Sequence, residues 1–130
     1  SGLMIAQVTA AALVSENKVL SHPASVDSIP TSANQEDFVS MGTHAARKAL
    51  EAVENAETVI AIELLAGCQA VDFRRDLKPG RGTGAAYTVI RRAVPPLEKD
   101  RLLQTDIQQL ADLIRRGEIV AAVEAAVGQL

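Results

Sequence analysis

The segment Leu3–Leu20 is the feature that most constrains the fold. As far as Val14 it is apolar around nearly the whole helical circumference, with Gln7 and Thr9 as the interruptions. A helix of this kind is usually buried inside a larger structure, and it is shorter than the ~20 apolar residues that a membrane span needs. A chain of 130 residues offers few ways to surround such a helix. The pattern therefore predicts a helix whose packing partners lie largely outside this chain.

The rest of the sequence also favours helices. After a loop at 21–33, Ser32 and Gln35 match a capping box, with Asn34 as an alternative N-cap. The helix that starts there is expected to reach Ala70 or to break near Gly67, because no proline interrupts it before residue 79. No segment has the alternating pattern of a strand, and the predicted fold class is all-α.

Three shorter helices are expected near the C-terminus. After a glycine-rich loop at 76–84, an apolar helical pattern continues to residue 93 and stops at two prolines. A second capping box at Thr105 and Gln108 starts the next helix, and Gly117 can end it in a left-handed conformation. Three valines at helical spacing mark the last helix, Val120, Val123 and Val127. The glycine-rich loop lacks a preceding strand and a Gly-Lys-Ser/Thr ending, so we expect no nucleotide site there.

Composition limits the functions of the chain. The net charge of −3 leaves no basic surface, so nucleic acids and anionic membranes are not expected partners. Apolar residues make up 48% of the sequence, but aromatic residues make up only 2%. Alanine supplies much of the apolar content. Each alanine buries little area, so the core is expected to need other segments or subunits. The single Cys68 excludes an internal disulfide and fits a cytoplasmic protein.

Few side chains are candidates for chemistry. His, Cys and acidic residues lack metal-ligand spacing, so no metal site is expected. Cys68 is interpreted as a small buried apolar residue rather than a nucleophile. The densest polar cluster is 34–37, Asn-Gln-Glu-Asp. Taken from spacing alone, this cluster is ordinary chemistry of a helix start, because Asn caps helices and acidic residues favour the first turn.

Long runs of the sequence resemble a known family. Residues 2–18 and, more specifically, the loop at 22–37 (HPASVDSIPTSANQED) are similar to the aromatic amino acid lyase family, and to its histidine ammonia-lyases in particular. Several shorter matches follow: Glu63-Leu64-Leu65, Gln69 with Asp72-Phe73-Arg74, Arg91, and Asp100-Arg101. The resemblance covers the whole chain and is strongest in residues 1–74. Residues 1–78 are thus expected to hold bundle helices and an active-site loop, and 79–130 peripheral C-terminal helices.

The resemblance implies a fold, a cofactor and partners. Family members are about four times longer, mostly helical, and form homotetramers around a shared helical bundle, with three subunits contributing to each active site. Their electrophile is methylidene-imidazolone, made from an internal Ala-Ser-Gly, and this chain has no such tripeptide. The family's catalytic tyrosines also lie in its N-terminal part. The chain is therefore expected to be the C-terminal part of a longer enzyme and to be inactive alone.

The resemblance also assigns a site residue. Histidine-specific members have a glutamate at the position of Glu36, facing the imidazole of the substrate, where phenylalanine-type relatives have glutamine. A carboxylate can accept the ring N–H, and a helix N-terminus would favour its ionised form. Gln35 is expected beside the substrate. Phe38 stands where many members have histidine, and we interpret that difference as tolerated.

The sequence therefore predicts the C-terminal segment of a histidine ammonia-lyase, which converts L-histidine to urocanate and ammonia. A tyrosine ammonia-lyase or an aminomutase is the alternative within the family. The alternative from another class is a stand-alone helical oligomerisation module, a relic of a lyase without catalysis.

Overall fold

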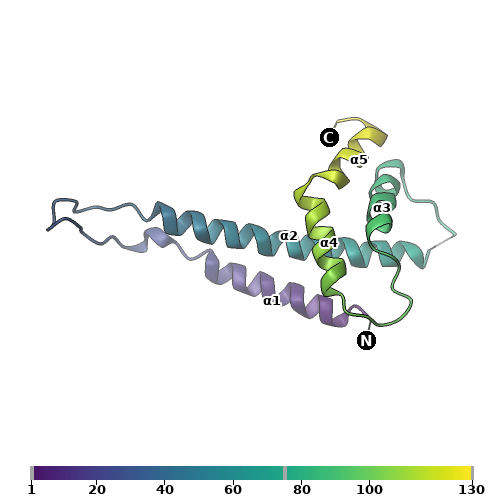
Figure 1. The fold of residues 1–130 in the computed structure, drawn as a ribbon, viewed down its shortest axis with the longest axis horizontal. Helices are drawn as coiled ribbons and strands as arrows, with labels where there is room; N and C mark the ends of the chain where they lie inside the picture. Colours follow the sequence, from purple (N-terminus) through teal and green to yellow (C-terminus); the bar gives the residue numbers. More distant parts are fainter. Residues whose placement is uncertain (1, 75, 130) are drawn as a thin grey trace.

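The residues that the structure describes fold into a long helical hairpin with three short helices at one end (Figure 1). The computed structural model describes residues 2–74 and 76–129. Helix α1 spans Met4–Leu20 and α2 spans Gly42–Asp72, with the short 3₁₀ turn η1 at Ala24–Val26 in the loop between them. The remaining helices are α3 at Arg81–Ala93, α4 at Gln104–Arg115 and α5 at Glu118–Val127. The described residues contain no strand, which confirms the all-α prediction.

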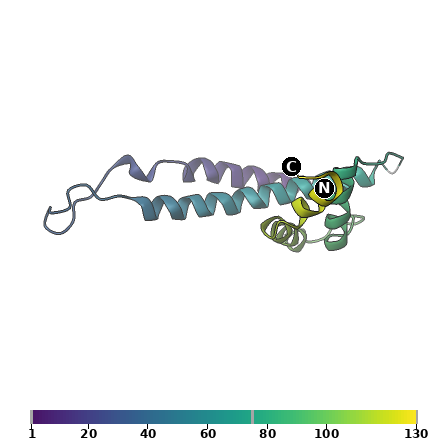
Figure 2. The ribbon, with the colours of Figure 1, turned by 90° about the horizontal axis from the view of Figure 1, so that it is seen from above.

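Helices α1 and α2, which form the hairpin, lie side by side in both views (Figures 1 and 2). Polar contacts join the end of α1 to the middle of α2. The Asn17 side chain donates to the carbonyl of Ala52 at 3.1 Å, and Asn55 donates to Glu16 and Asn17 at 3.0 Å each. Helix α2 is 31 residues long and continues through Gly67, so the break considered there does not occur. The long helix carries the loop to the far end of the molecule.

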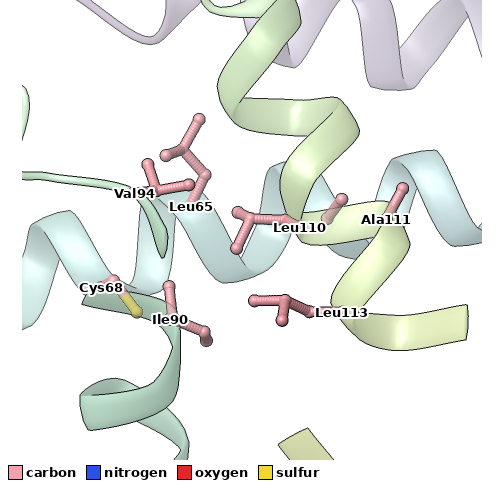
Figure 3. Packing of buried hydrophobic residues seen from close by; sticks show 8 residues of the cluster. Leu65, Cys68, Ile90, Val94, Leu110, Ala111 and Leu113 are labelled. Carbon is pink, nitrogen blue, oxygen red and sulfur yellow. The ribbon is translucent and has the colours of Figure 1, made fainter. Parts of the chain in front are cut away.

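The hydrophobic core lies at the opposite end of α2 from the loop. Figure 3 shows α4 side chains directed toward α2 and α3, with Leu110 and Leu113 facing Leu65 and Ile90. The core cluster consists of Ala61, Leu65, Cys68, Ile90, Val94, Leu110, Ala111 and Leu113. It joins α2 to α3 and α4, so these helices are anchored by one small core.

The hairpin itself is poorly covered within this chain. Ala6 is the buried residue of α1, while Ile5 is 67% exposed and Val19 is 72% exposed. On α2, Leu50 and Val53 are also exposed. The sequence predicted that the partners of the first helix lie outside the chain, and the chain itself does not bury this helix.

Two helix starts differ from the sequence-based expectation. Helix α3 begins at Arg81, inside the predicted glycine-rich loop, and the Thr83 hydroxyl donates to the Gly80 carbonyl at 3.1 Å in its first turn. Helix α4 begins at Gln104, and its N-cap residue Leu103 makes no side-chain capping bond. The capping box at Thr105 is therefore wrong, because Thr105 is already inside the helix. The left-handed stop at Gly117 is confirmed, with φ of 68°.

No helix in the ranges 2–74 and 76–129 combines the length and the apolar character of a membrane span.

Candidate active-site loop

The candidate site residues lie in the connection between α1 and α2. This connection, residues 21–41, forms the end of the hairpin farthest from the core (Figure 1). Its base is held to α2, because the Lys48 ammonium donates to the carbonyl of His22. The tip beyond it extends away from the helices, and its side chains are exposed in this chain (Figure 1).

The tip is a tight turn closed by two backbone hydrogen bonds. The Thr31 N–H donates to the Glu36 carbonyl at 3.0 Å, and the Glu36 N–H donates to the Thr31 carbonyl at 3.4 Å. Between these two residues, Ser32, Ala33 and Asn34 all have left-handed backbone, with φ of 52°, 56° and 68°. A third hydrogen bond, from Gln35 N–H to the Ser32 carbonyl at 3.1 Å, completes the turn.

This turn overturns the prediction that a helix starts at Ser32 or Asn34. A capping box needs helical backbone after the cap, and the three left-handed residues reverse the chain instead. Asparagine tolerates that conformation better than most residues because its short polar side chain can bond locally. Helix α2 starts only at Gly42, where the Ser40 hydroxyl accepts the Gly42 N–H at 3.2 Å.

Glu36 does not lie at a helix N-terminus, contrary to the expectation from the sequence. Glu36 belongs to the closing pair of the turn and lies six residues before α2, so the helix N-terminus does not act on it. Its side chain is exposed, and its Oε2 accepts a hydrogen bond from the Thr31 hydroxyl at 3.4 Å. Gln35 is exposed beside it. The chain thus holds a carboxylate and an amide at the end of a projecting loop and leaves both available to a ligand.

A second polar cluster lies in the core region, far from the tip. Asp72 accepts hydrogen bonds from the Tyr87 hydroxyl and the Arg91 guanidinium, both at 2.6 Å. The side chains of Asp72 and Arg91 are 7% and 10% exposed. Burial raises the pKa of the nearby Cys68 thiol, an effect that the Arg91 charge partly offsets. This supports the interpretation of Cys68 as a packing residue, because a raised pKa disfavours the thiolate.

Other residues that carry the family resemblance also hold the fold. The buried Gln69 side chain accepts the Leu97 N–H at 2.8 Å and donates to the Leu97 carbonyl at 3.5 Å. Arg101 pairs with the buried Asp106 at 2.9 Å and donates to the carbonyls of Pro95 and Pro96. Both side chains fix the segment between α3 and α4. These roles could not be read from the sequence, because the partners are distant in sequence or are backbone groups.

A groove of about 1260 Å³ lies between α1, α2 and α4. It is lined by Ile5 and Thr9 of α1, by Asn55 of α2, and by Ile107 and Arg115 of α4, among others. These residues lie toward the core end of the hairpin, and none belongs to the tip. The groove is therefore separate from Glu36 and Gln35.

The profile of the family described as "Aromatic amino acid lyase" matches residues 1–92, which include both hairpin helices, the projecting loop and most of α3.

The chain belongs to the aromatic amino acid lyase family.

Its relatives include histidine ammonia-lyases along the whole chain. It is 61% identical over 130 residues to the histidine ammonia-lyase of Symbiobacterium thermophilum, covering 100% of this chain and 26% of that protein. The crystal structure of histidine ammonia-lyase from Trypanosoma cruzi is 52% identical, with a TM-score of 0.92, over 98% of this chain and 25% of that one. The chain thus spans about a quarter of the length of these lyases.

A tyrosine aminomutase is less similar in sequence. The crystal structure of tyrosine aminomutase from Streptomyces globisporus is 40% identical, with a TM-score of 0.90, over 97% of this chain and 24% of that one. The fold is therefore shared across the family, and sequence identity rather than shape separates the histidine ammonia-lyases from the aminomutase.

Proposed function

We propose that this chain is the C-terminal segment of a histidine ammonia-lyase, which removes ammonia from L-histidine to give urocanate. The observation that carries this proposal is the 61% identity along all 130 residues to a histidine ammonia-lyase. The identity to the tyrosine aminomutase is 40%. The difference favours histidine as the substrate of the whole enzyme.

The role proposed for this chain is to deliver Glu36 and Gln35 to an active site that other parts of the enzyme complete. The projecting loop supports this role, because it exposes both side chains away from the core of its own chain. The carboxylate of Glu36 can accept the imidazole N–H of histidine and can stabilise an imidazolium. A phenyl ring offers no such donor, and leaving a buried carboxylate without one is costly.

The electrophile of the reaction is not made by this chain. Methylidene-imidazolone forms from Ala-Ser-Gly, and the sequence contains no such tripeptide. Residues of this chain therefore do not form that group, and we propose that the N-terminal part of the enzyme supplies it. We further propose a cytoplasmic homotetramer, supported by the exposed apolar faces of the hairpin and by the buried, reduced Cys68.

The substitution Glu36→Gln in the full-length enzyme tests this assignment. It keeps the shape of the side chain and removes the charge. A charge-assisted hydrogen bond is worth roughly 1.5–3 kcal/mol, so kcat/KM for histidine should fall on the order of 10- to 150-fold or more. The rate with phenylalanine should not fall, because the carboxylate that disfavours a phenyl ring is gone.

The matched control is Glu98→Gln, an exposed glutamate between α3 and α4. It should leave kcat/KM unchanged. If Glu36→Gln leaves histidine turnover intact and shifts only the melting temperature, Glu36 is a structural residue of the turn and the assignment is wrong.

A further inference from the structure

The hydroxyl of Ser28 links the two arms of the loop, the segments 28–31 and 36–39 that lead to and from the tip. It accepts the Val39 N–H at 2.8 Å and lies 3.0 Å from the Val39 carbonyl, to which it donates. One side chain therefore satisfies both backbone groups of a residue eleven positions away. These two hydrogen bonds link the two segments as a pair of backbone hydrogen bonds would.

The Ser28–Val39 pair is in register with the turn that carries Glu36. Three positions separate Ser28 from Thr31 on one arm of the loop, and three separate Glu36 from Val39 on the other. The two cross-links thus close a loop with arms of equal length. A shift of either arm by one residue would break both cross-links and turn Glu36 in another direction.

Apolar packing contributes little to the order of these arms. Within residues 21–40, which the structure describes, the partly buried residues are Ala24, Ser28 and Val39. The neighbouring apolar side chains Ile29 and Phe38 are 67% and 85% exposed. Hydrogen bonds therefore hold the arms together, and the Ser28–Val39 pair is their half-buried centre.

The turn also stores conformational strain. A left-handed backbone is unfavourable for an L-residue other than glycine, and Ser32, Ala33 and Asn34 adopt it in succession. Such a turn persists only when its surroundings determine it. The cross-link at Ser28 is the part of those surroundings that this chain provides below the turn.

We infer that Ser28 is a positioning residue for Glu36: by binding both backbone groups of Val39 it fixes the register of the loop and hence the place of the carboxylate. This inference rests on the proposed function, because it assigns Ser28 an effect on the reaction only through Glu36. Ser28 itself does not touch the substrate.

The test compares Ser28→Ala, Glu36→Gln and the double variant in the full-length enzyme. Misplacing a catalytic group by about 1 Å can cost on the order of 100-fold in rate, so Ser28→Ala should lower kcat/KM for histidine by about 10- to 100-fold. Because Ser28 acts through Glu36, the double variant should be little worse than Glu36→Gln alone, a non-additive pattern. Ser28→Thr keeps the hydroxyl and should restore most of the activity.

Ser25→Ala is the matched control. Ser25 is an exposed serine of η1 in the same loop, without a hydrogen bond from its side chain to any described residue, and its loss should leave kcat/KM unchanged. If Ser28→Ala does not assemble, Ser28→Cys takes its place, because a thiol is a weak donor and acceptor of similar size.

The outcomes separate the two proposals. An enzyme that does not release ammonia from histidine overturns the proposed function. An active enzyme in which Ser28→Ala and Ser28→Cys keep full kcat/KM, or in which the Ser28 and Glu36 effects multiply independently, overturns the role of Ser28 and leaves the proposed function in place.

Discussion

At the scale of single residues, Asp72, Tyr87 and Arg91 form a polar cluster whose two charged side chains are almost fully covered. Removing one member of a buried ion pair typically costs about 3–5 kcal/mol, because the other charge stays buried without its partner. The ring of Tyr87 also lies 5.7 Å from the Arg91 guanidinium. The phenol, the carboxylate and the guanidinium therefore act together to link the end of α2 to α3.

This cluster predicts a dependence of stability on alkaline pH. The hydrogen bond to Asp72 is the main reason that the pKa of Tyr87 is raised above its ordinary value near 10. Below pH 10 the phenol is protonated in both the folded and the unfolded chain, and its contribution is complete. As the pH rises further, the unfolded chain releases this proton first, so the contribution is lost as the pH passes through the folded pKa.

Tyr87→Phe should therefore destabilise the chain by about 1–3 kcal/mol at neutral pH, where a hydrogen bond to a charged group is lost. The difference from the parent chain should shrink above pH 10. Denaturant unfolding at several pH values measures this, in a Cys68→Ala background that removes a nearby thiol whose pKa is also raised. A difference that stays constant across this range would contradict the proposed coupling to Asp72.

At the scale of elements, the contact between α3 and α5 depends on a glycine. A side chain at Gly82 would begin 3.3 Å from the Val123 side chain and 3.5 Å from that of Val127. Arg81 adds a hydrogen bond to the carbonyl of Ala126. Helix α5 has no buried residue of its own, so this close approach is a large part of what holds it.

Two glycine substitutions in α3 should therefore differ in sign. Gly82→Leu forces extra volume against α5 and should destabilise the chain by about 1–3 kcal/mol. Gly84→Ala meets ordinary contact distance, with Pro79 at 3.6 Å, and should stabilise α3 by roughly 0.5–1 kcal/mol. Thermal unfolding of the two variants checks this, and a stabilising Gly82→Leu would show that α5 does not pack on α3.

At the scale of the whole molecule, the hairpin exposes apolar surface along most of its length. On α1, Met4, Ile5 and Val8 are each more than half exposed, and Leu50 and Val53 of α2 are as well. Exposed apolar side chains on both helices indicate contact with other protein. The small core does not cover this surface, because α4 contacts the hairpin only at the end opposite the 21–41 loop (Figure 1).

The 130-residue chain alone should therefore be helical and should self-associate, with two or four copies joined through the hairpin. Light scattering at several concentrations, with circular dichroism, measures this. Replacing Ile5 and Val8 by lysine should shift the mass toward that of one chain, because charges disfavour burial of that face. A parent chain that is monomeric and melts sharply would contradict the expectation.

The same chain should release no ammonia from L-histidine. It carries Glu36 but no Ala-Ser-Gly, so the proposed electrophile is absent from it. The absorbance of urocanate reports the reaction continuously, and the full-length enzyme serves as the positive control. Product formation by the purified chain alone would show that the proposed division of the active site is wrong.

The sequence by itself determined the all-helical class, the first helix and the family. Helical periodicity is local, so it placed the first helix at Leu3–Leu20, where the structure has Met4–Leu20, and it marked Gly117 as a left-handed stop. The long loop motif identified the lyase family because it is a run of consecutive residues. Neither the helix nor the family depends on which residues distant in sequence are in contact in the fold.

Only the tertiary structure decided the shape of the loop and the roles of the buried polar residues. A capping box is a pattern of two residues, and Ser32 and Gln35 satisfy it equally well in a turn, so the start of α2 at Gly42 could not be predicted from it. The partners of Ser28 and Gln69 lie eleven and 28 residues away. Hydrogen bonds at such separations leave no periodic trace in the sequence, because they depend on how the helices bring separate segments together.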